Sequence, residues 1–373
     1  MDTSDPTIRF NADGICNHCH TYDIHVRTLV WTPEQTRVQL TPLIDKIRAE
    51  GRGKEYDCLI GVSGGVDSTY LAWKVRELGL RPLAVHMDNG WDAELAVRNI
   101  ELTLKKLHID LVTEVLDWDE FRDIQLAFLE ASTPDAEIPS DHAIGAVMLD
   151  TALKHGIKYI LGGSNIRTES CVPAAWSTGV RDWRYIKSVH ARFGKIPLLT
   201  FPHYSLAKWT FLTTSGRVRR IDLLNCIQYR KSEAMDVLKN QLGWTYYGGK
   251  HYESIYTRFF QAVILPQKFG ADKRRGHLSA LILSGELSRE RALEEMKEPP
   301  CPADQAREDR EFVLKKLGLS EAEFERIMTL PPRSIADYPA YENSLALQTY
   351  RAAVRVRRRL MAGVRAASPG PVR

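Results

Sequence analysis

Apolar positions along the first half of the chain follow two patterns, a spacing of three or four residues that is typical of helices and short continuous runs that are typical of buried strands. Helical spacing predicts helices over 33–50, 68–78, 93–107, 121–129 and 142–155. Apolar runs predict strands over 58–62, 83–87, 111–116 and 159–161. Because strands and helices alternate, the expected fold class is α/β, a doubly wound parallel sheet with helices on both faces. Ligands of such sheets bind at the carboxyl ends of the strands.

The same pattern divides the chain into three regions. Residues 1–25 are polar and carry a Cys-x-x-Cys pair after a turn, which predicts a small N-terminal cysteine knuckle. Residues 26–230 contain the alternating strands and helices and predict one α/β domain. Helical spacing returns afterwards, so 231–373 is expected to form a mostly helical C-terminal region that completes the substrate site.

Composition and charge narrow the classes of partner. The 373 residues have a formal net charge of +4, spread along the chain, which disfavours a nucleic-acid partner. The N-terminal residues are neither basic nor apolar and no run of about 18 apolar residues occurs, so we expect no membrane span and a cytoplasmic location. Six cysteines in a chain of this length indicate free thiols, with one metal site at most, and not a disulfide framework.

A predicted strand is joined to a predicted helix by the segment Ser63-Gly64-Gly65-Val66-Asp67-Ser68. Two glycines let the backbone turn tightly and bring its N–H groups close to an anion, and the helix start adds its positive dipole end. Ser63 and Ser68 can donate hydroxyl hydrogen bonds to phosphate oxygens, whereas Asp67 is expected to hold Mg²⁺ or to cap the loop. A Walker loop is excluded because no lysine follows the glycines. The alternative is an ordinary glycine-rich turn.

This segment matches the SGGxDS signature of the PP-loop ATP pyrophosphatases, and the chain resembles that superfamily. The resemblance implies that ATP is bound and cleaved to AMP and pyrophosphate, with AMP transferred to a carbonyl or carboxyl oxygen. Two further strand ends agree with a nucleotide site, and the residues expected there are His86, Asp88, Gly162, Gly163 and Asn165. Taken by itself, the first of these strand ends is equally consistent with an ordinary Asp-Asn-Gly turn.

A closer resemblance is carried by four passages, His86-Met-Asp-Asn-Gly-Trp91, Ile138-Pro-Ser-Asp-His142, Tyr246-Tyr-Gly-Gly-Lys-His-Tyr-Glu253 and Leu265-Pro-Gln-Lys-Phe-Gly-Ala-Asp-Lys-Arg-Arg-Gly-His277. From about Asp5 to about Tyr338 the chain resembles the N-acetyl sugar amidotransferases of surface-polysaccharide and lipopolysaccharide O-antigen biosynthesis. The resemblance implies that the acetamido group of a nucleotide-linked sugar, such as a UDP-sugar, becomes an acetamidino group with ATP and ammonia. ATP is needed because an amide carbonyl is a poor electrophile until its oxygen carries a leaving group.

Charged residues in these passages are the remaining candidates for the site. Lys268, Lys273 and Arg274 are expected to neutralise phosphate charge, although each also fits a solvated basic face. Asp141 and His142 join a carboxylate to an imidazole and are candidates for sugar binding or proton transfer, while Asp141 equally fits a helix cap. The polar residues expected to contact the substrate are Lys250, His251, Glu253 and His277.

The cysteines bear on the source of ammonia and on a second metal. None stands at the N-terminus or on a Gly-x-Cys-x-Gly elbow, as a built-in glutaminase requires, so we expect a separate glutaminase subunit. Cys16 and Cys19 have the spacing of half a Zn²⁺ site, which normally has four ligands. The amidotransferase resemblance implies a second such pair upstream, and the chain shows none there. An incomplete zinc site and two free surface thiols both stay open.

Two other functions stay open as well. A tRNA-modifying PP-loop enzyme would also pair the loop with Cys-x-x-Cys motifs, and the arginines of 351–359 could contact RNA phosphates. The small net charge and the lack of a thiol-relay cysteine argue against it. The second alternative is a nucleotide-binding regulatory module without catalysis, against which the intact Ser63, Asp67 and Ser68 argue.

Overall fold

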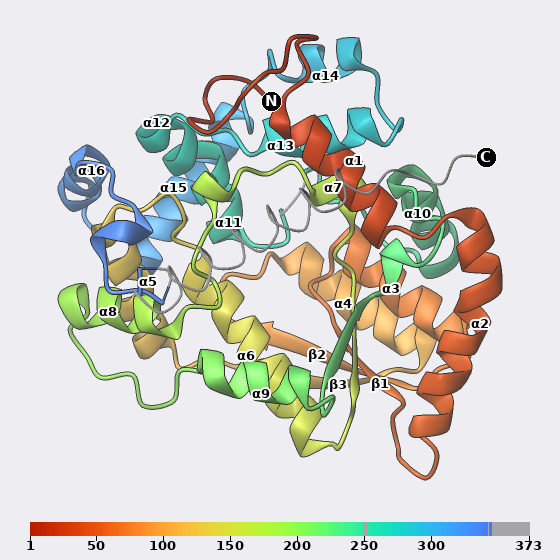
Figure 1. Ribbon diagram of the computed structural model, residues 1–373. Coiled ribbons are helices and arrows are strands. Elements are labelled where there is room, and N and C mark those ends of the chain that lie inside the picture. Colours follow the sequence, from red (N-terminus) through yellow and green to blue (C-terminus); the bar gives the residue numbers. More distant parts are fainter. Residues whose placement is uncertain (250–251, 342, 345–373) are drawn as a thin grey trace, which may run out of the picture.

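The computed structural model describes residues 1–249, 252–341 and 343–344. Its centre is a parallel sheet of five strands in the order β3-β2-β1-β4-β5, flanked by helices (Figure 1). The strands are β1 (Cys58–Gly61), β2 (Pro82–Asp88), β3 (Asp110–Val115), β4 (Tyr159–Gly162) and β5 (Arg219–Asp222). The α/β class predicted from the alternating pattern is confirmed.

The strand order reverses beside β1. The chain passes from β1 to β2 and β3 on one side of the sheet and later places β4 on the other side of β1. Doubly wound sheets form their ligand crevice at the carboxyl ends of the strands where this reversal occurs. The Ser63–Ser68 segment begins two residues after β1 and therefore lies at the crevice.

The central strand separates two hydrophobic cores. Leu59 belongs to the larger core, whereas Cys58 and Ile60 belong to the smaller core on the other face, because side chains alternate across a strand. The larger core includes residues of α5 (Trp118–Ala131), α6 (Ile138–Lys154) and α8 (Trp183–Phe193). The smaller core includes residues of α2 (Pro33–Glu50), α3 (Val66–Glu77) and α4 (Glu94–Leu107). Burial on both faces explains the continuous apolar runs of the central strands.

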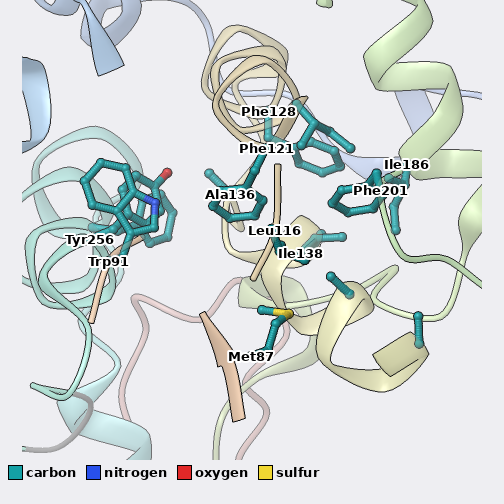
Figure 2. Packing of buried hydrophobic residues seen from close by; sticks show 14 of the residues in the cluster. Met87, Trp91, Leu116, Phe121, Phe128, Ala136, Ile138, Ile186, Phe201 and Tyr256 are labelled. Carbon is teal, nitrogen blue, oxygen red and sulfur yellow. The ribbon is translucent and has the colours of Figure 1, made fainter. Parts of the chain in front are cut away.

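Aromatic side chains make up much of the larger core (Figure 2). Phe121 and Phe128 of α5 belong to the same cluster as Phe201, and Trp91 packs against Tyr256 with ring centroids 5.3 Å apart. Since Tyr256 belongs to α11 (Ile255–Phe259), this contact ties the C-terminal helices to the segment that follows β2.

Strand β5 has no counterpart in the sequence prediction. Its residues are exposed or half-buried, so they form no apolar run. In the sheet Arg220 pairs with Ile160 and Ile221 pairs with Leu161, in parallel. Tertiary pairing with β4, and not local propensity, therefore creates this strand.

Helices α3, α5 and α6 begin earlier than their apolar spacing predicts. The side chain of Asp117 accepts the N–H of Glu120 at 3.0 Å and caps α5 from a position before the first apolar residue. Pro139 lies in the first turn of α6, where its missing N–H costs no helical hydrogen bond. Polar caps and first turns thus extend helices beyond the apolar pattern.

Residues 17–25, expected within the N-terminal cysteine knuckle, belong to α1 (Asn17–Leu29), and Phe10 and Cys16 form an isolated antiparallel bridge before it. The knuckle stays a prediction. The sulfur of Cys16 caps this helix by accepting the N–H of Cys19 at 3.5 Å. Most of α1 is exposed, which explains its polar composition. The helix packs against α7 (Ile166–Glu169) and α13 (Arg274–Leu283).

From residue 231 the described chain is mostly helical, as predicted, and its helices lie above the sheet in Figure 1. α10 (Lys231–Val237) packs against α3, and α11 packs against α15 (Ala303–Leu317). No helix in the described part of the chain combines the length and the apolar character needed to cross a bilayer. The remaining α-helices are α9 (Leu206–Thr214), α12 (Leu265–Phe269), α14 (Arg289–Glu295) and α16 (Glu321–Thr329).

Candidate active site

The Ser63–Ser68 segment, named the phosphate loop, makes a tight turn from β1 into α3. Gly64 has a φ of 78°, and a Cβ atom at this position would meet the backbone oxygen of Ala96 at 2.5 Å. Only glycine fits, because an L side chain would be strained and would collide with α4. The local geometry is therefore the one that the two glycines predict.

The hydroxyls of Ser63 and Ser68 lie together in the phosphate loop. The Ser63 N–H donates to Ser68 Oγ at 3.2 Å, and the two hydroxyl oxygens are 3.1 Å apart. The dipole of α3, a helix of 12 residues, favours an anion beside them. Both serines line a space of about 390 Å³, named the phosphate hollow, with Gly65, Val66, Asp67, Ile144, Gly163, Ser164, Glu169, Lys231, Tyr246, Tyr247, Gly249 and Glu253.

Asp67 is held by side chains from two distant segments. The hydroxyl of Tyr229 donates a short hydrogen bond to Asp67 Oδ1, and the amide nitrogen of Asn165 lies 3.5 Å from the same oxygen. Burial and then the charge of Asp67 raise the pKa of Tyr229 far above its usual value, so the hydroxyl remains a donor. Sequence reasoning missed Tyr229, because a buried aromatic residue without a motif looks like any core residue.

The two glycines at the end of β4 are approached closely by different parts of the chain. A Cβ atom at Gly163 would lie 3.2 Å from the backbone oxygen of Asp67, so glycine allows β4 to approach the phosphate loop. A Cβ atom at Gly162 would instead lie 2.3 Å from Oδ1 of Asp222 on β5. Of this pair, Gly163 alone lines the phosphate hollow.

A second cavity of about 420 Å³, named the loop cavity, adjoins the phosphate hollow. The two share Ser63, Ser68, Ile144 and Glu253. Apolar side chains from β2 and α6 form much of its wall, a surrounding suited to a flat base. Its other lining residues are Gly61, Val62, Val85, His86, Met87, Asn89, Asp92, Glu137, Ser140, Asp141, Val147, Met148, Ser254, Thr257, Gln261 and Lys273.

His86 lines the loop cavity and is fixed at both ring nitrogens. Its Nδ1 lies 3.0 Å from the Val62 carbonyl oxygen and its Nε2 lies 2.9 Å from Asp92 Oδ2. Burial disfavours the charged ring, but the hydrogen bond and charge of Asp92 outweigh it and raise the pKa of His86. Asp88 is placed differently. Its carboxylate accepts the Gly90 N–H at 2.7 Å and closes the Asp-Asn-Gly turn, and its expected nucleotide contact stays a prediction.

Three carboxylates and one lysine meet beside the loop cavity. Lys273 Nζ lies 3.1 Å from Glu137 Oε2, and Asp135 and Asp141 are charged neighbours of this pair. Asp141 opens into the cavity, but the enclosing protein and then the charges of Asp135 and Glu137 raise its pKa to about 7. Such a carboxyl group can take up or release a proton near neutral pH.

His142 is not part of this cluster, which corrects its expected role in proton transfer. The ring is fully buried, its Nδ1 lies 2.7 Å from the Val180 carbonyl oxygen, and its Nε2 accepts the Tyr204 N–H at 3.3 Å. Burial lowers the pKa of His142 to about 4, so the ring stays neutral. Adjacent residues of a helix point in different directions, which separates His142 from the cavity that Asp141 lines.

The three basic candidates separate in space. Lys273 lies in the loop cavity, whereas the ammonium group of Lys268 donates a short hydrogen bond to the Ile327 carbonyl and thereby joins α12 to α16. Burial lowers the pKa of Lys268 to about 8, and its phosphate role is corrected to this structural one. Arg274 lines a third cavity and its guanidinium pairs with Asp272 at 2.8 Å.

This third cavity, named the C-terminal cavity, has a volume of about 350 Å³. It shares Lys231, Tyr246 and Gly249 with the phosphate hollow, and Gln261 and Lys273 with the loop cavity. The three spaces therefore border one another. The remaining lining residues are Thr168, Gly248, Tyr252, Arg258, Ala262, Asp272, Arg274, His277, Leu278, Leu281, Glu295, Glu298, Pro299, Pro300, Cys301 and Pro302.

The expected substrate residues are divided between these spaces. Glu253 lines the phosphate hollow and the loop cavity, and His277 lines the C-terminal cavity. Lys250 and His251 lie outside the described residues. Sequence reasoning missed Lys231 and Gln261 because a single lysine at a helix start and a single glutamine in a helix carry no signal of their own.

The sulfur atoms of Cys16 and Cys19 lie 3.4 Å apart. Burial and then the Cys16 thiol raise the pKa of Cys19, which favours the thiol over the thiolate that zinc binds. Within the described residues no group of three or more His, Cys, Asp or Glu side chains is arranged to hold a metal ion. Among the residues that the structure describes, the pair thus gains no additional zinc ligand.

One family model matches the C-terminal part of the chain. Residues 253–354 match the family model of the LPS biosynthesis protein WbpG-like C-terminal domain. This match confirms the resemblance to proteins of surface-polysaccharide biosynthesis. It begins at Glu253 and includes Gln261, Lys273 and Arg274, which line the loop cavity, the C-terminal cavity or both.

The other similarities are a sequence match to a small part of one relative and three solved structures of low sequence identity. Over 84 residues, 22% of this chain, the sequence is 38% identical to a glutamine-hydrolysing GMP synthase of Pyrobaculum aerophilum, and the match spans 16% of that relative's length. An NH3-dependent NAD synthetase from Campylobacter jejuni is 13% identical, over 76% of this chain and 96% of that chain, with a TM-score of 0.32. An NMN synthetase from Francisella tularensis is 13% identical, over 70% and 96%, with a TM-score of 0.29. A predicted tRNA methyltransferase subunit from Methanocaldococcus jannaschii is 17% identical, over 48% and 74%, with a TM-score of 0.29. At such identities and scores the solved structures indicate nothing about chemistry.

Proposed function

We propose that this chain, whose C-terminal part resembles WbpG-like proteins of LPS biosynthesis, is an ATP-dependent amidotransferase. Its substrate is a nucleotide-linked N-acetyl sugar, whose acetamido group becomes an acetamidino group. One observation carries the proposal above all. The phosphate hollow, built on the Ser63–Ser68 loop, borders two further cavities, so ATP and a second substrate can meet at one phosphate site.

The geometry favours one placement of ATP. The adenine base occupies the loop cavity between β2 and α6, and the phosphates extend over the phosphate loop toward Lys231. Ser63 and Ser68 donate to phosphate oxygens, and the lysine offsets part of the charge. Asp67, Glu169 and the Ser68 hydroxyl line the same hollow and offer oxygen ligands of the kind that Mg²⁺ takes beside phosphates. When bound there, Mg²⁺ would neutralise charge on the phosphates.

The proposed reaction has two displacements. The acetamido oxygen attacks the α-phosphorus of ATP, the bond to the β-phosphate oxygen breaks, and pyrophosphate leaves with that electron pair. Ammonia then adds to the activated carbon, the carbon–oxygen bond breaks, and AMP departs with that electron pair and with one proton from the added nitrogen, which leaves the protonated amidine. Nothing is oxidised or reduced. Preorganised donors at the phosphate loop stabilise the charge that develops in the first step.

Asp141 is the proton acceptor in this scheme. Ammonium has no lone pair to attack with, so one proton must be removed before the second displacement. Because its pKa is raised to about 7, the Asp141 carboxylate can accept that proton near neutral pH. Lys273 and Glu137 hold the cluster together, which makes them positioning residues.

Ammonia comes, in this proposal, from a separate glutaminase. Burial raises the pKa of Cys58, Cys171, Cys226 and Cys301, so these thiols are poor nucleophiles. Cys16 and Cys19 belong to the start of α1, on the helix that packs against α7 and α13. The four buried thiols therefore do not suit glutamine hydrolysis, and Cys16 and Cys19 stand on no Gly-x-Cys-x-Gly elbow.

The direct test incubates the purified chain with ATP, Mg²⁺, ammonium and a set of UDP-linked N-acetyl sugars. We expect AMP, pyrophosphate and an amidine product that mass spectrometry identifies. Replacing ammonium with glutamine should abolish the product unless a glutaminase is added. Absence of AMP with every sugar offered would refute the proposed function, and hydrolysis of glutamine by the chain alone would refute the separate donor.

A further inference from the structure

We propose that the C-terminal cavity binds the sugar ring of the substrate and leaves the nucleoside diphosphate outside it. This inference rests on the proposed function and adds the place where the sugar is selected. The cavity borders the phosphate hollow at Lys231, Tyr246 and Gly249. An acetamido group on a sugar in the cavity can therefore reach the phosphates of ATP without sharing the loop cavity with the adenine.

The volume of the C-terminal cavity selects a ligand of this size. An N-acetylhexosamine occupies roughly 250 Å³ at the packing density of organic crystals. The cavity has about 350 Å³, which accommodates such a ring with a few waters. A complete sugar nucleotide is larger than roughly 500 Å³ at the same density, so the proposal places its nucleotide part beyond the cavity.

The chemistry of the walls also suits a hydroxyl-rich, uncharged ligand. Arg274, Asp272 and Gln261 offer planar groups that donate or accept hydrogen bonds in fixed directions, as neighbouring hydroxyls require. Tyr246 has 42% of its surface exposed and supplies an aromatic face. The positive side chains that line the cavity are largely neutralised by nearby carboxylates, since Arg258 pairs with Asp309 and Lys273 pairs with Glu137. Balanced charge favours a sugar over a diphosphate.

Two features hold these walls rigidly. The guanidinium of Arg274 bonds to Asp272 through Nε and Nη2, and its Nη1 donates to the Glu298 carbonyl at 3.0 Å. The Pro299–Pro302 segment closes one side, where the Tyr252 hydroxyl donates to the Pro300 carbonyl at 3.1 Å. Prolines and bidentate pairing reduce the ordering that a ligand must impose on binding.

The origin of the lining residues agrees with this assignment. Most of them lie within 253–354, the part of the chain that matches the LPS biosynthesis domain, whereas the phosphate loop lies outside the match. A site that selects the sugar belongs in the part that resembles polysaccharide proteins. The proposed ATP site is built on the phosphate loop, which does not need to be specific to polysaccharide proteins.

The test compares Arg274→Ala with Arg275→Ala, its neighbour in α13, whose side chain pairs with Asp2 and does not line the cavity. We expect Arg274→Ala to raise KM for the UDP-linked N-acetyl sugar about tenfold to thirtyfold. The KM for ATP and the inhibition constant of UDP alone should stay within twofold. Arg275→Ala should change none of the three.

Two outcomes would overturn the assignment. A parallel rise in the inhibition constant of UDP would place the diphosphate in the cavity, and an unchanged KM for the sugar nucleotide would remove the cavity from the substrate path. Arg274→Lys, which keeps the charge but loses the planar fork, tests the same point if the alanine variant misfolds. Failure of the wild-type chain to form AMP would contradict the proposed function instead, and calorimetry with UDP and the UDP-sugar would still test the cavity.

Discussion

Replacing Asp141 with asparagine should stabilise the protein above neutral pH. Asp141 lies beside Asp135 and Glu137, and the protein that encloses the loop cavity and then these charges raise its pKa from the ordinary 3.8 to about 7. Between these two values the unfolded chain loses the proton while the folded chain keeps it. The free-energy cost that Asp141 imposes on the folded state is therefore absent below about pH 4. This cost grows as the pH rises and is largest above pH 7.

The size of the effect follows from the pKa. The difference between 3.8 and about 7 corresponds to about 4 kcal/mol without screening. Because the carboxylate meets solvent in the loop cavity, screening reduces this to about 1 kcal/mol. The asparagine side chain has no proton to lose, so the Asp141→Asn variant should gain about that much above pH 7, equivalent to roughly 2 °C in Tm, and nothing near pH 4.

Thermal unfolding of both proteins between pH 4 and 9 measures the difference. Asp150→Asn is the matched control, since Asp150 is an exposed residue of the same helix and pairs with Lys208 at 2.6 Å. Loss of this surface pair should cost at most about 1 kcal/mol and yield no gain at high pH. A Tm difference for the Asp141 variant that stays constant across the pH range, or that grows toward acid, would refute the reasoning.

Three further predictions concern the phosphate loop, the loop before α9 and the support of Asp67. Gly64→Ala should abolish ATP binding, measured by calorimetry, because the added Cβ atom collides with α4. The control Gly53→Ala, at a φ of 79° with open space around it, should leave ATP binding intact. Binding of ATP by the Gly64→Ala variant would contradict this prediction. Glu120→Gln should lower the free energy of urea unfolding by about 2 kcal/mol, because the buried carboxylate accepts several backbone N–H groups of the loop before α9. An unchanged free energy would disprove that Glu120 anchors this loop. Tyr229→Phe should lower kcat/KM for ATP about tenfold with little change in Tm, because Asp67 loses its buried hydrogen-bond donor. Unaltered kinetics would show that this hydrogen bond does not position Asp67.

Some of the candidate site could be predicted because its parts are contiguous. The turn at Gly64, the two serines and the start of α3 lie within six residues, so their geometry follows from local backbone rules. Residues at the ends of other strands could be predicted only as a region. There Gly163 reaches the loop, whereas Asp88 closes its own turn.

Other assignments failed because neighbours in sequence need not share an environment. Asp141 opens into a cavity while His142, the next residue, is buried with both ring nitrogens bonded to backbone groups. In the same way Lys273 lies in the loop cavity, whereas Lys268 joins two helices of the C-terminal region. Charge and proximity in sequence do not reveal which side of a helix faces a cavity.

The sequence by itself determined the α/β class, the buried central strands and the phosphate loop, because apolar spacing and glycine geometry act over a few residues. The tertiary structure alone decided where distant polar groups meet. It brought Tyr229 to Asp67, Lys231 to the phosphate hollow, and Lys273 to the carboxylates beside Asp141. Such meetings depend on how helices pack over the sheet, and packing is set by the sum of many weak contacts that no short segment encodes.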